Sequence, residues 1–372
     1  MIPYTRPYLP ARERLDKYID GIYERQWLTN NGQLVQELTA RLETYLGVEN
    51  LLLVSNGTLA LQIAYRALGI SERAHYERVE AITTPFTFVA TASSLKWEGV
   101  EPVFVDIDSA TWCLDPANIE SAITPATRAI VPTHVFGNAC YIEKINEIAL
   151  RNNLKVVYDG AHSFGVTYKG DSILKYGDAA TLSFHATKLF HSIEGGAIVF
   201  KERKHYEAAR KMINFGITGP ENIDCLGINA KMNEFQAAMG LSVLDELEEN
   251  LGLRSKVWSN YESKLADKLV TQKKNVNCSN NCSYFPILLS DSHELELVQT
   301  SLQSKAIFAR RYFYPSINKS IFMDVENDCE VSENIASRIL CLPLYSDLDH
   351  FSQRSIIDCV LSQIDRKIEA KV

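Results

Sequence analysis

Residues 51–68 read LLLVSNGTLALQIAYRAL, and this stretch indicates the fold class of the whole chain. Its first four residues suit a strand, its Asn56-Gly57 pair suits a turn, and the apolar spacing after the turn suits a helix. The alternation recurs, with further apolar strands expected in AITTP (81–85), EPVFVDID (101–108), RAIVPTHVFG (128–137) and LKVVYD (154–159). Apolar strands separated by helical segments are typical of an α/β fold, with a mostly parallel central sheet and helices on both faces.

Other segments refine this expectation. The strands near 180–184 and 196–200 have no helix between them, so we expect them to pair antiparallel. The sequence DPANIESAI (115–123) suggests a helix, and IFARRYFYP (307–315) suggests a strand.

After residue 230, the alternation of short strands and helices gives way to a longer amphipathic segment. An apolar stripe from Phe235 to Leu265 predicts a long helix, interrupted or kinked near Gly252, that joins two domains. We therefore expect a large domain over residues 1–245 and a small C-terminal α/β domain over residues 246–372.

The composition is that of an ordinary globular protein, with 46% hydrophobic and 23% charged residues among 372. A formal net charge of −8 argues against partners such as nucleic acid or an anionic membrane. No run of about 18 apolar residues predicts a membrane span, and MIPYTRPYLP at the start lacks the apolar segment of a signal peptide. The eight cysteines form no CxxC pair, which indicates free thiols and a cytoplasmic location.

Ligands of open α/β sheets bind beyond the carboxyl ends of the strands, and four segments at such ends carry polar or aromatic side chains. In Ser55–Thr58, the glycine and the first amides of the next helix suit a phosphate, although Thr58 would also serve as an ordinary helix cap. Asp159 faces either a ligand or a local turn, and His162 follows three residues later. Thr84–Phe88 places aromatic rings at a strand end, where they pack in the core or face a ligand.

The fourth segment, SFHATKLFHSIEGG at 183–196, surrounds Lys188 with apolar and aromatic residues. Desolvation lowers the pKa of a lysine and makes its amine nucleophilic, as Schiff-base chemistry requires. The alternative is an exposed loop. His185 and His191 have no carboxylate or cysteine at metal-ligand spacing, so no metal site is expected. Together, a phosphate-binding turn, an aromatic face, an aspartate and an apolar lysine are what pyridoxal phosphate requires.

Seven motifs resemble those of the DegT/DnrJ/EryC1/StrS sugar aminotransferases, a family with the type I, aspartate aminotransferase-like fold of pyridoxal phosphate enzymes. They are SNGTLAL (55–61), TPFTFVAT (84–91), FVDID (104–108), YDGAHSFG (158–165), SFHATK (183–188), EGG (194–196) and GINAKMNEFQAA (227–238). The resemblance extends over essentially the whole chain and keeps the order of the motifs. Gly160 departs from the family, which commonly has alanine there, and only reduces bulk beside the cofactor.

The resemblance implies a role for each matching residue. Lys188 is similar to the lysine that bonds covalently to pyridoxal 5′-phosphate and moves protons, and Asp159 to the carboxylate that keeps the pyridine nitrogen protonated. His162 matches a position near the phenolic oxygen of the cofactor. The other matches are Phe88 and Ala161 on opposite faces of the ring, Gly57, Thr58 and Ser183 at the phosphate, and Asn229, which reaches the phosphate from the neighbouring subunit of a homodimer with shared active sites.

Within the family, WLTNNG (27–32), the Lys188 segment and RRYFYPSIN (310–318) resemble the enzymes that transfer an amino group from L-glutamate to the 4-keto carbon of a dTDP-linked sugar. The expected acceptor is dTDP-4-dehydro-6-deoxy-D-glucose, an intermediate for O-antigen or another surface glycan. Expected substrate contacts are Thr29, Asn30 and Tyr314.

Several alternatives stay open. Amination at C3 and a UDP- or GDP-linked sugar are alternatives to the expected reaction. A dehydratase of the same fold would carry histidine in place of Lys188. A non-enzymatic regulatory protein would not require the intact lysine and aspartate.

Overall fold

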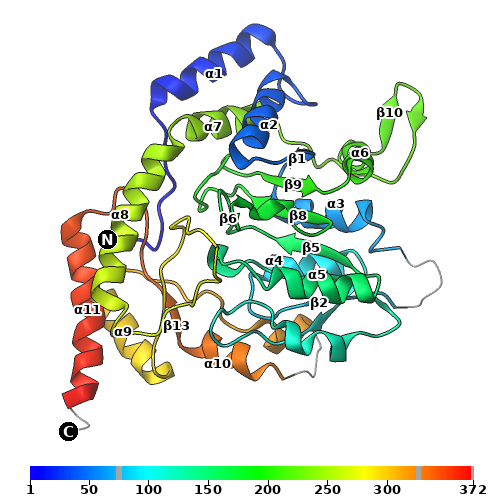
Figure 1. Ribbon diagram of the computed structural model, residues 1–372. Helices are drawn as coiled ribbons and strands as arrows, with labels where there is room; N and C mark the ends of the chain where they lie inside the picture. The colour runs from blue at the N-terminus through cyan, green and yellow to red at the C-terminus, as the bar shows by residue number, and fades with distance from the viewer. Residues whose placement is uncertain (73–77, 324–327, 370–372) are drawn as a thin grey trace.

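A seven-stranded sheet forms the centre of the protein (Figure 1). The structure is a computed structural model that describes residues 1–72, 78–323 and 328–369. The strand order is β1-β9-β8-β5-β4-β2-β3. The strands are β1 (Leu51–Val54), β2 (Glu80–Thr83), β3 (Glu101–Phe104), β4 (Thr127–Val131), β5 (Lys155–Asp159), β8 (Ala179–Ser183) and β9 (Gly196–Phe200).

Most neighbouring strands of this sheet run parallel, as the sequence predicts. β3, β2, β4, β5 and β8 are parallel, whereas β9 is antiparallel to both β8 and β1. The expected α/β class and the expected antiparallel pairing of the two late strands are therefore confirmed.

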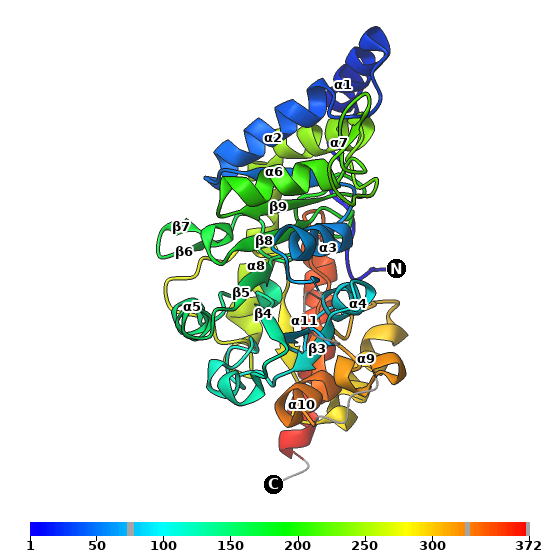
Figure 2. The same ribbon diagram turned by 90° about the vertical axis from the view of Figure 1, so that its right-hand side faces the viewer.

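Alternate side chains of each strand enter two hydrophobic cores, one on each face of the sheet. Leu51 and Leu53 pack in one core, whereas Leu52 and Val54 pack in the other. The helices are α2 (Gln33–Leu46) and α5 (Ile142–Arg151) at the first core, and α3 (Gly57–Ala67), α4 (Val89–Trp97) and α6 (Arg203–Met212) at the second (Figure 2). Most residues of the strands are apolar because both faces of the sheet are covered.

The C-terminal part of the chain has a third core, with buried residues from Val257 to Ile364. This part of the chain contains α8 (Leu247–Leu265), α9 (Ser292–Ser304), α10 (Glu330–Arg338), α11 (His350–Glu369) and the antiparallel pair β12 (Pro286–Leu288) and β13 (Ile339–Cys341). The buried apolar residues of α10 pack in the first core instead. The remaining elements are α1 (Arg12–Arg25), α7 (Glu234–Asp245) and the short hairpins β6 (Thr167–Tyr168) with β7 (Asp171–Ser172) and β10 (Ile217–Gly219) with β11 (Asn222–Ile223). The division at residue 245 stays a prediction, and Ile2 pairs with Ile307 across it.

The predicted break in the long helix lies at a different residue. α7 ends at Asp245 and α8 begins at Leu247, so Gly252 is inside α8. Glu246 has φ −115° and ψ 13°, and its carboxylate accepts hydrogen bonds from the Tyr8 hydroxyl (2.8 Å) and the Ala11 amide (3.2 Å). Contacts with the N-terminal segment therefore determine the break, rather than the flexibility of the glycine.

Two other expectations of secondary structure are wrong. Residues 115–123 form two 3-10 turns, Pro116–Asn118 and Glu120–Ala122, because the Asp115 carboxylate binds the Ala117 amide and tightens the first turn. The segment 307–315 makes only isolated bridges, Ile307 with Ile2 and Arg310 with Cys341. Among the described residues, no strand runs beside it over several residues, so no ladder forms.

All eight cysteines are free thiols, as expected from their spacing. None of the described helices combines the length and apolar character needed to cross a bilayer.

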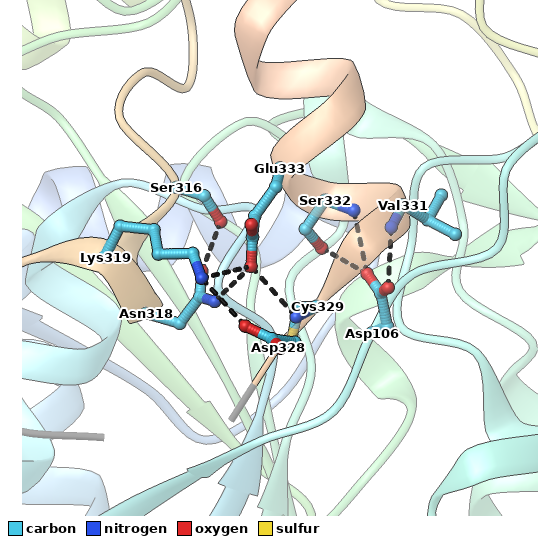
Figure 3. A network of polar contacts seen from close by, with 9 residues as sticks. All are labelled: Asp106, Ser316, Asn318, Lys319, Asp328, Cys329, Val331, Ser332 and Glu333. Atoms are coloured by element: carbon cyan, nitrogen blue, oxygen red, sulfur yellow. Dashed lines mark hydrogen bonds and ion pairs between the residues drawn. The ribbon is translucent and has the colours of Figure 1, made fainter. Parts of the chain in front are cut away.

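Asp106, in the FVDID motif after β3, binds the start of helix α10 (Figure 3). Its carboxylate accepts hydrogen bonds from the amides of Val331 and Ser332, both at 2.8 Å, and from the Ser332 hydroxyl at 2.6 Å. Cys329, at the N-cap position, makes no side-chain cap. An acidic side chain supplied by the sheet therefore caps this helix and is favourably placed at its positive end.

We expect Asp106→Ala to lower the free energy of unfolding by about 2–3 kcal/mol, since hydrogen bonds to a charged group contribute about 1.5–3 kcal/mol. Urea unfolding would measure the change. The matched control is Asp328→Ala, which removes the exposed ion pair of Asp328 with Lys319 (2.9 Å) and should cost less than about 1 kcal/mol. Equal losses in the two variants would contradict a capping role.

Candidate active site

A cavity of about 260 Å³ lies where the carboxyl ends of β5 and β8 meet the start of α3. Eight residues singled out from the sequence line it: Gly57, Thr58, Phe88, Asp159, Ala161, His162, Ser183 and Lys188. They come from four separate segments of the chain, which the parallel strands bring to one edge of the sheet.

The turn before α3 brings the backbone of Gly57 against Ser183. A Cβ atom at Gly57 would lie 2.9 Å from Cβ of Ser183, so only glycine allows this approach. Asn56, rather than Thr58, caps the helix, because its side chain accepts a hydrogen bond from the Leu59 amide at 2.8 Å. The first amides of a helix have no partner within the helix and favour an anion.

Asp159 is buried at the end of β5. One carboxylate oxygen accepts the Ala161 amide at 3.0 Å, and the other accepts the Thr91 hydroxyl at 2.7 Å. The two interpretations left open by the sequence, a local turn and a group facing the cavity, therefore both hold. Each carboxylate oxygen has capacity for a further donor, so the residue is able to bind a ligand N–H.

His162 is buried in a stack of aromatic rings. Its ring is parallel to those of Phe136 and Phe313, with centroids 5.9 Å and 5.7 Å away. Burial, and secondarily the charge of Lys188, hold the pKa of His162 well below its usual value. The ring is therefore neutral, and because its Nδ1 accepts the Phe136 amide (3.2 Å), Nε2 carries the proton and acts as a donor.

The amine of Lys188 donates a hydrogen bond to the Tyr284 hydroxyl at 3.3 Å. Burial lowers the pKa of Lys188 below its usual value. Tyr312 and Asp159 act in the opposite direction, whereas the positive charge of Arg310 lowers this pKa further. More of the amine is thus unprotonated near neutral pH than in an exposed lysine, which favours nucleophilic attack and proton transfer.

Four of the predicted site residues do not reach this cavity within the same chain. Asn229 is exposed and forms a bridge with Asn214. Thr29 and Asn30 are exposed in the segment between α1 and α2. Tyr314 is 53% exposed, and the Arg311 guanidinium lies 3.4 Å from its ring centroid.

The structure adds residues that the sequence did not single out. Arg310, Tyr312 and Phe313 line the cavity in place of Tyr314. They belong to the quoted segment 310–318, and the predicted substrate contact of Tyr314 stays a prediction. Thr91 lies in the quoted motif TPFTFVAT, whereas no signal in the sequence pointed to Tyr284.

Comparisons with known proteins agree with this geometry. The sequence profile of the DegT/DnrJ/EryC1/StrS aminotransferase family matches residues 11–361. The chain is 42% identical over 369 residues to a dTDP-4-amino-4,6-dideoxy-D-glucose transaminase of Shigella dysenteriae, covering 97% of each chain. It is 37% identical to a transaminase of the same name from Escherichia coli, covering 94% of this chain and 95% of the relative. Among solved structures, it is similar to DesI in the presence of its TDP-sugar product, with a TM-score of 0.91, 31% identity, and coverage of 100% of this chain and 95% of DesI.

Proposed function

Because the chain belongs to the DegT/DnrJ/EryC1/StrS aminotransferase family and is a pyridoxal phosphate-dependent enzyme, we propose that it moves the amino group of L-glutamate to the 4-keto carbon of dTDP-4-dehydro-6-deoxy-D-glucose. The product is dTDP-4-amino-4,6-dideoxy-D-glucose, for O-antigen or another surface glycan made from the cytoplasm. The likeness to two transaminases of this name over almost the whole chain carries the proposal. The competing reactions are amination at C3 of the sugar and amination of a UDP- or GDP-linked sugar.

The residues around the cavity fit pyridoxal phosphate. The contact of Gly57 with Ser183 leaves no room for a Cβ atom and puts a hydroxyl next to helix amides, as a phosphate site needs. Asp159 offers a buried carboxylate to a ring N–H, and Lys188 offers a desolvated amine. Phosphate, ring and aldehyde thus each have a complementary group in one cavity.

Bound pyridoxal phosphate supplies an electron sink that stabilises the negative charge left when a proton leaves the amino-acid Cα. We assign Gly57, Thr58 and Ser183 to its phosphate, and Asp159 to its ring nitrogen. Phe88 and Ala161 would pack against the cofactor ring, and the neutral His162 would donate a hydrogen bond from Nε2 to its phenolic oxygen. As a carboxylate, Asp159 would pair with a protonated ring nitrogen.

Lys188 moves the protons of both half-reactions. Its Nζ takes a proton from Cα of glutamate in the first half-reaction and gives a proton to C4 of the sugar in the second. A single amine serves both steps because 2-oxoglutarate leaves before the sugar enters. The depressed pKa of Lys188 brings it closer to neutral pH, where a group of this kind both accepts and donates a proton effectively.

We also propose a homodimer in which Asn229 completes the phosphate site of the partner. Asn229 is exposed beside a group of exposed apolar residues, namely Phe215, Ile217, Ile223, Leu226, Ile228 and Phe235. The hairpin of β10 and β11 in this region projects from the rest of the protein (Figure 1). A patch of this kind is typical of a protein interface. Thr29 and Asn30 belong to the same side, since Asn30 lines a second cavity together with Lys231.

Arg310 supplies a positive charge for the anionic groups of the substrates. Its guanidinium lies 4.4 Å from the Tyr312 ring centroid. We expect Arg310→Gln to raise a substrate KM about tenfold with a smaller change in kcat, because a hydrogen bond to a charged group contributes about 1.5–3 kcal/mol. Steady-state kinetics with glutamate and with the nucleotide sugar would show which substrate is affected.

The matched control for this variant is Arg354→Gln, on an exposed face of α11 with 83% of its side chain accessible. It should leave both KM values unchanged. If Arg310→Gln also leaves both unchanged, Arg310 does not contact either substrate.

A panel of nucleotide keto-sugars tests the function directly. The purified protein should be yellow, L-glutamate should bleach its absorbance, and only the correct sugar should restore the colour. NMR of the product identifies the carbon that carries nitrogen. Nitrogen at C3, or restoration only by a UDP- or GDP-linked sugar, would overturn the proposed substrate while leaving the aminotransferase intact.

A further inference from the structure

Three buried threonine hydroxyls form a chain that ends at Asp159. The Thr91 hydroxyl is 2.7 Å from Oδ2 of Asp159. Thr87 Oγ1 lies 2.9 Å from Thr91 Oγ1 and 3.0 Å from Thr133 Oγ1. These threonines come from three places, namely helix α4, the residues before it and the residues after β4, and all three are at most 3% exposed.

The direction of every hydrogen bond in this chain follows from counting protons. An ionised carboxylate only accepts, so Thr91 uses its single hydroxyl proton on Asp159. The Thr91 oxygen is then left as an acceptor, and Thr87 must donate to it. Thr87 has thereby used its own proton, so Thr133 must donate to Thr87. All three O–H groups point toward the carboxylate.

Aligned hydroxyl dipoles polarise one another, and a low local dielectric strengthens the effect. A charged carboxylate at the end of such a chain is stabilised by more than its one direct donor. The row of hydroxyls also restrains Oδ2 of Asp159, so the remaining lone pairs of this carboxylate point in a fixed direction.

We propose that Thr91, Thr87 and Thr133 are positioning residues that orient the Asp159 carboxylate, and so hold the protonated ring nitrogen of the cofactor. The proposal rests on the role assigned to Asp159 above. It predicts that the loss of cofactor affinity is largest for removal of the Thr91 hydroxyl, smaller for Thr87 and smallest for Thr133, in the order of their distance from Asp159 along the hydrogen bonds.

The test measures binding of pyridoxamine 5′-phosphate to the apoenzyme by fluorescence, because this form of the cofactor makes no covalent bond with Lys188. Thr91→Val removes the hydroxyl with little change in shape and should raise the Kd at least about tenfold. Thr87→Val should raise the Kd less, about threefold, since Thr91 still donates to Asp159. Thr133→Val should change the Kd less than twofold.

Urea unfolding of the same variants separates positioning from structure. Thr91→Val and Thr87→Val each leave a buried hydroxyl without its acceptor, so both should lose stability. Thr91→Val should lose more, since it also removes the donor to Asp159. Thr83→Val is the matched control. The Thr83 hydroxyl is fully buried on β2 and donates to the Val131 carbonyl at 2.8 Å, so it takes no part in the row of hydroxyls that ends at Asp159. This variant should lose stability and leave the Kd within twofold.

Thr91→Ser and Thr91→Cys keep the test decisive if the valine variant does not fold. Serine retains the donor and should keep the wild-type Kd, whereas the weak S–H donor of cysteine should raise it at least about threefold. Equal Kd values for the serine and cysteine variants would overturn the proposal.

Asp159→Asn distinguishes this failure from failure of the underlying assignment. If the asparagine variant weakens binding but Thr91→Val does not, only the threonine proposal falls. If neither weakens binding, the assigned role of Asp159 falls with it.

Discussion

Lys188→Ala is expected to lower transamination at least about 10³-fold, within the range of 10²–10⁴-fold typical of lost general acid–base catalysis. The variant loses the cavity amine whose pKa is lowered by burial. It should still bind pyridoxal phosphate through the phosphate and ring contacts. Borohydride should therefore fix the cofactor to the wild-type protein but not to the variant. Single-turnover assays of each half-reaction would measure the loss.

The control for this prediction is Lys175→Ala, which removes an exposed lysine paired with Asp171 at 3.0 Å. Its kinetics should match the wild type. Full turnover by Lys188→Ala, or covalent fixation of the cofactor in that variant, would contradict the assignment of Lys188.

The same variant tests the shared active sites of the proposed homodimer. Mixing Lys188→Ala subunits with Asn229→Ala subunits should recover part of the activity, because one site of each hybrid dimer combines an intact Lys188 with an intact Asn229. Recovery requires that the two residues come from different chains. Absence of recovery in a verified hybrid dimer would show that Asn229 does not complete the partner's site.

Asp159→Asn is expected to cost about 2–5 kcal/mol of transition-state stabilisation, the range for truncating one partner of a buried charge pair. The corresponding loss in kcat/KM is about 30- to 4000-fold. Asparagine keeps the shape and one acceptor for the Ala161 amide or the Thr91 hydroxyl but has no charge to balance a protonated ring nitrogen. The absorbance spectrum of the bound cofactor should change along with the rate.

Asp178→Asn is the control for this effect. Asp178 is also a partly buried carboxylate near the sheet, and it binds Lys155 (3.1 Å) and the Val156 amide (2.9 Å) away from the cavity. Its loss should lower stability without changing the spectrum. An unchanged spectrum and rate in Asp159→Asn would exclude the proposed contact with the ring nitrogen.

Much of the site was predictable because its parts are local. Gly57 begins the helix that follows β1, Asp159 is the last residue of β5, and Lys188 lies five residues beyond β8. In a parallel sheet the carboxyl ends of the strands lie at one edge, so predicting the strands also predicts that these residues meet. The motif in residues 183–196 pointed to Lys188 for the same local reason, the apolar residues beside it.

Other parts of the site depended on distant segments. Tyr284 meets Lys188 across 96 residues, and Thr91 meets Asp159 across 68. The choice of Arg310 and Tyr312 over Tyr314 depends on how the 310–318 segment passes the cavity. Sequence spacing contains no information on such contacts, since they arise only when segments far apart in the chain pack together.

The sequence by itself determined the alternation of strands and helices, their apolar faces, and the glycine, aspartate and lysine at the strand ends. These features follow from side-chain periodicity and from turn chemistry over a few neighbouring residues. Only the tertiary structure decided where the long helix breaks, what caps α10, and which side chains surround Lys188 and Asp159. Glu246, Asp106 and Thr91 take these roles because packing brings their polar groups to partners far along the chain, and a buried polar group must find a partner wherever the fold provides one.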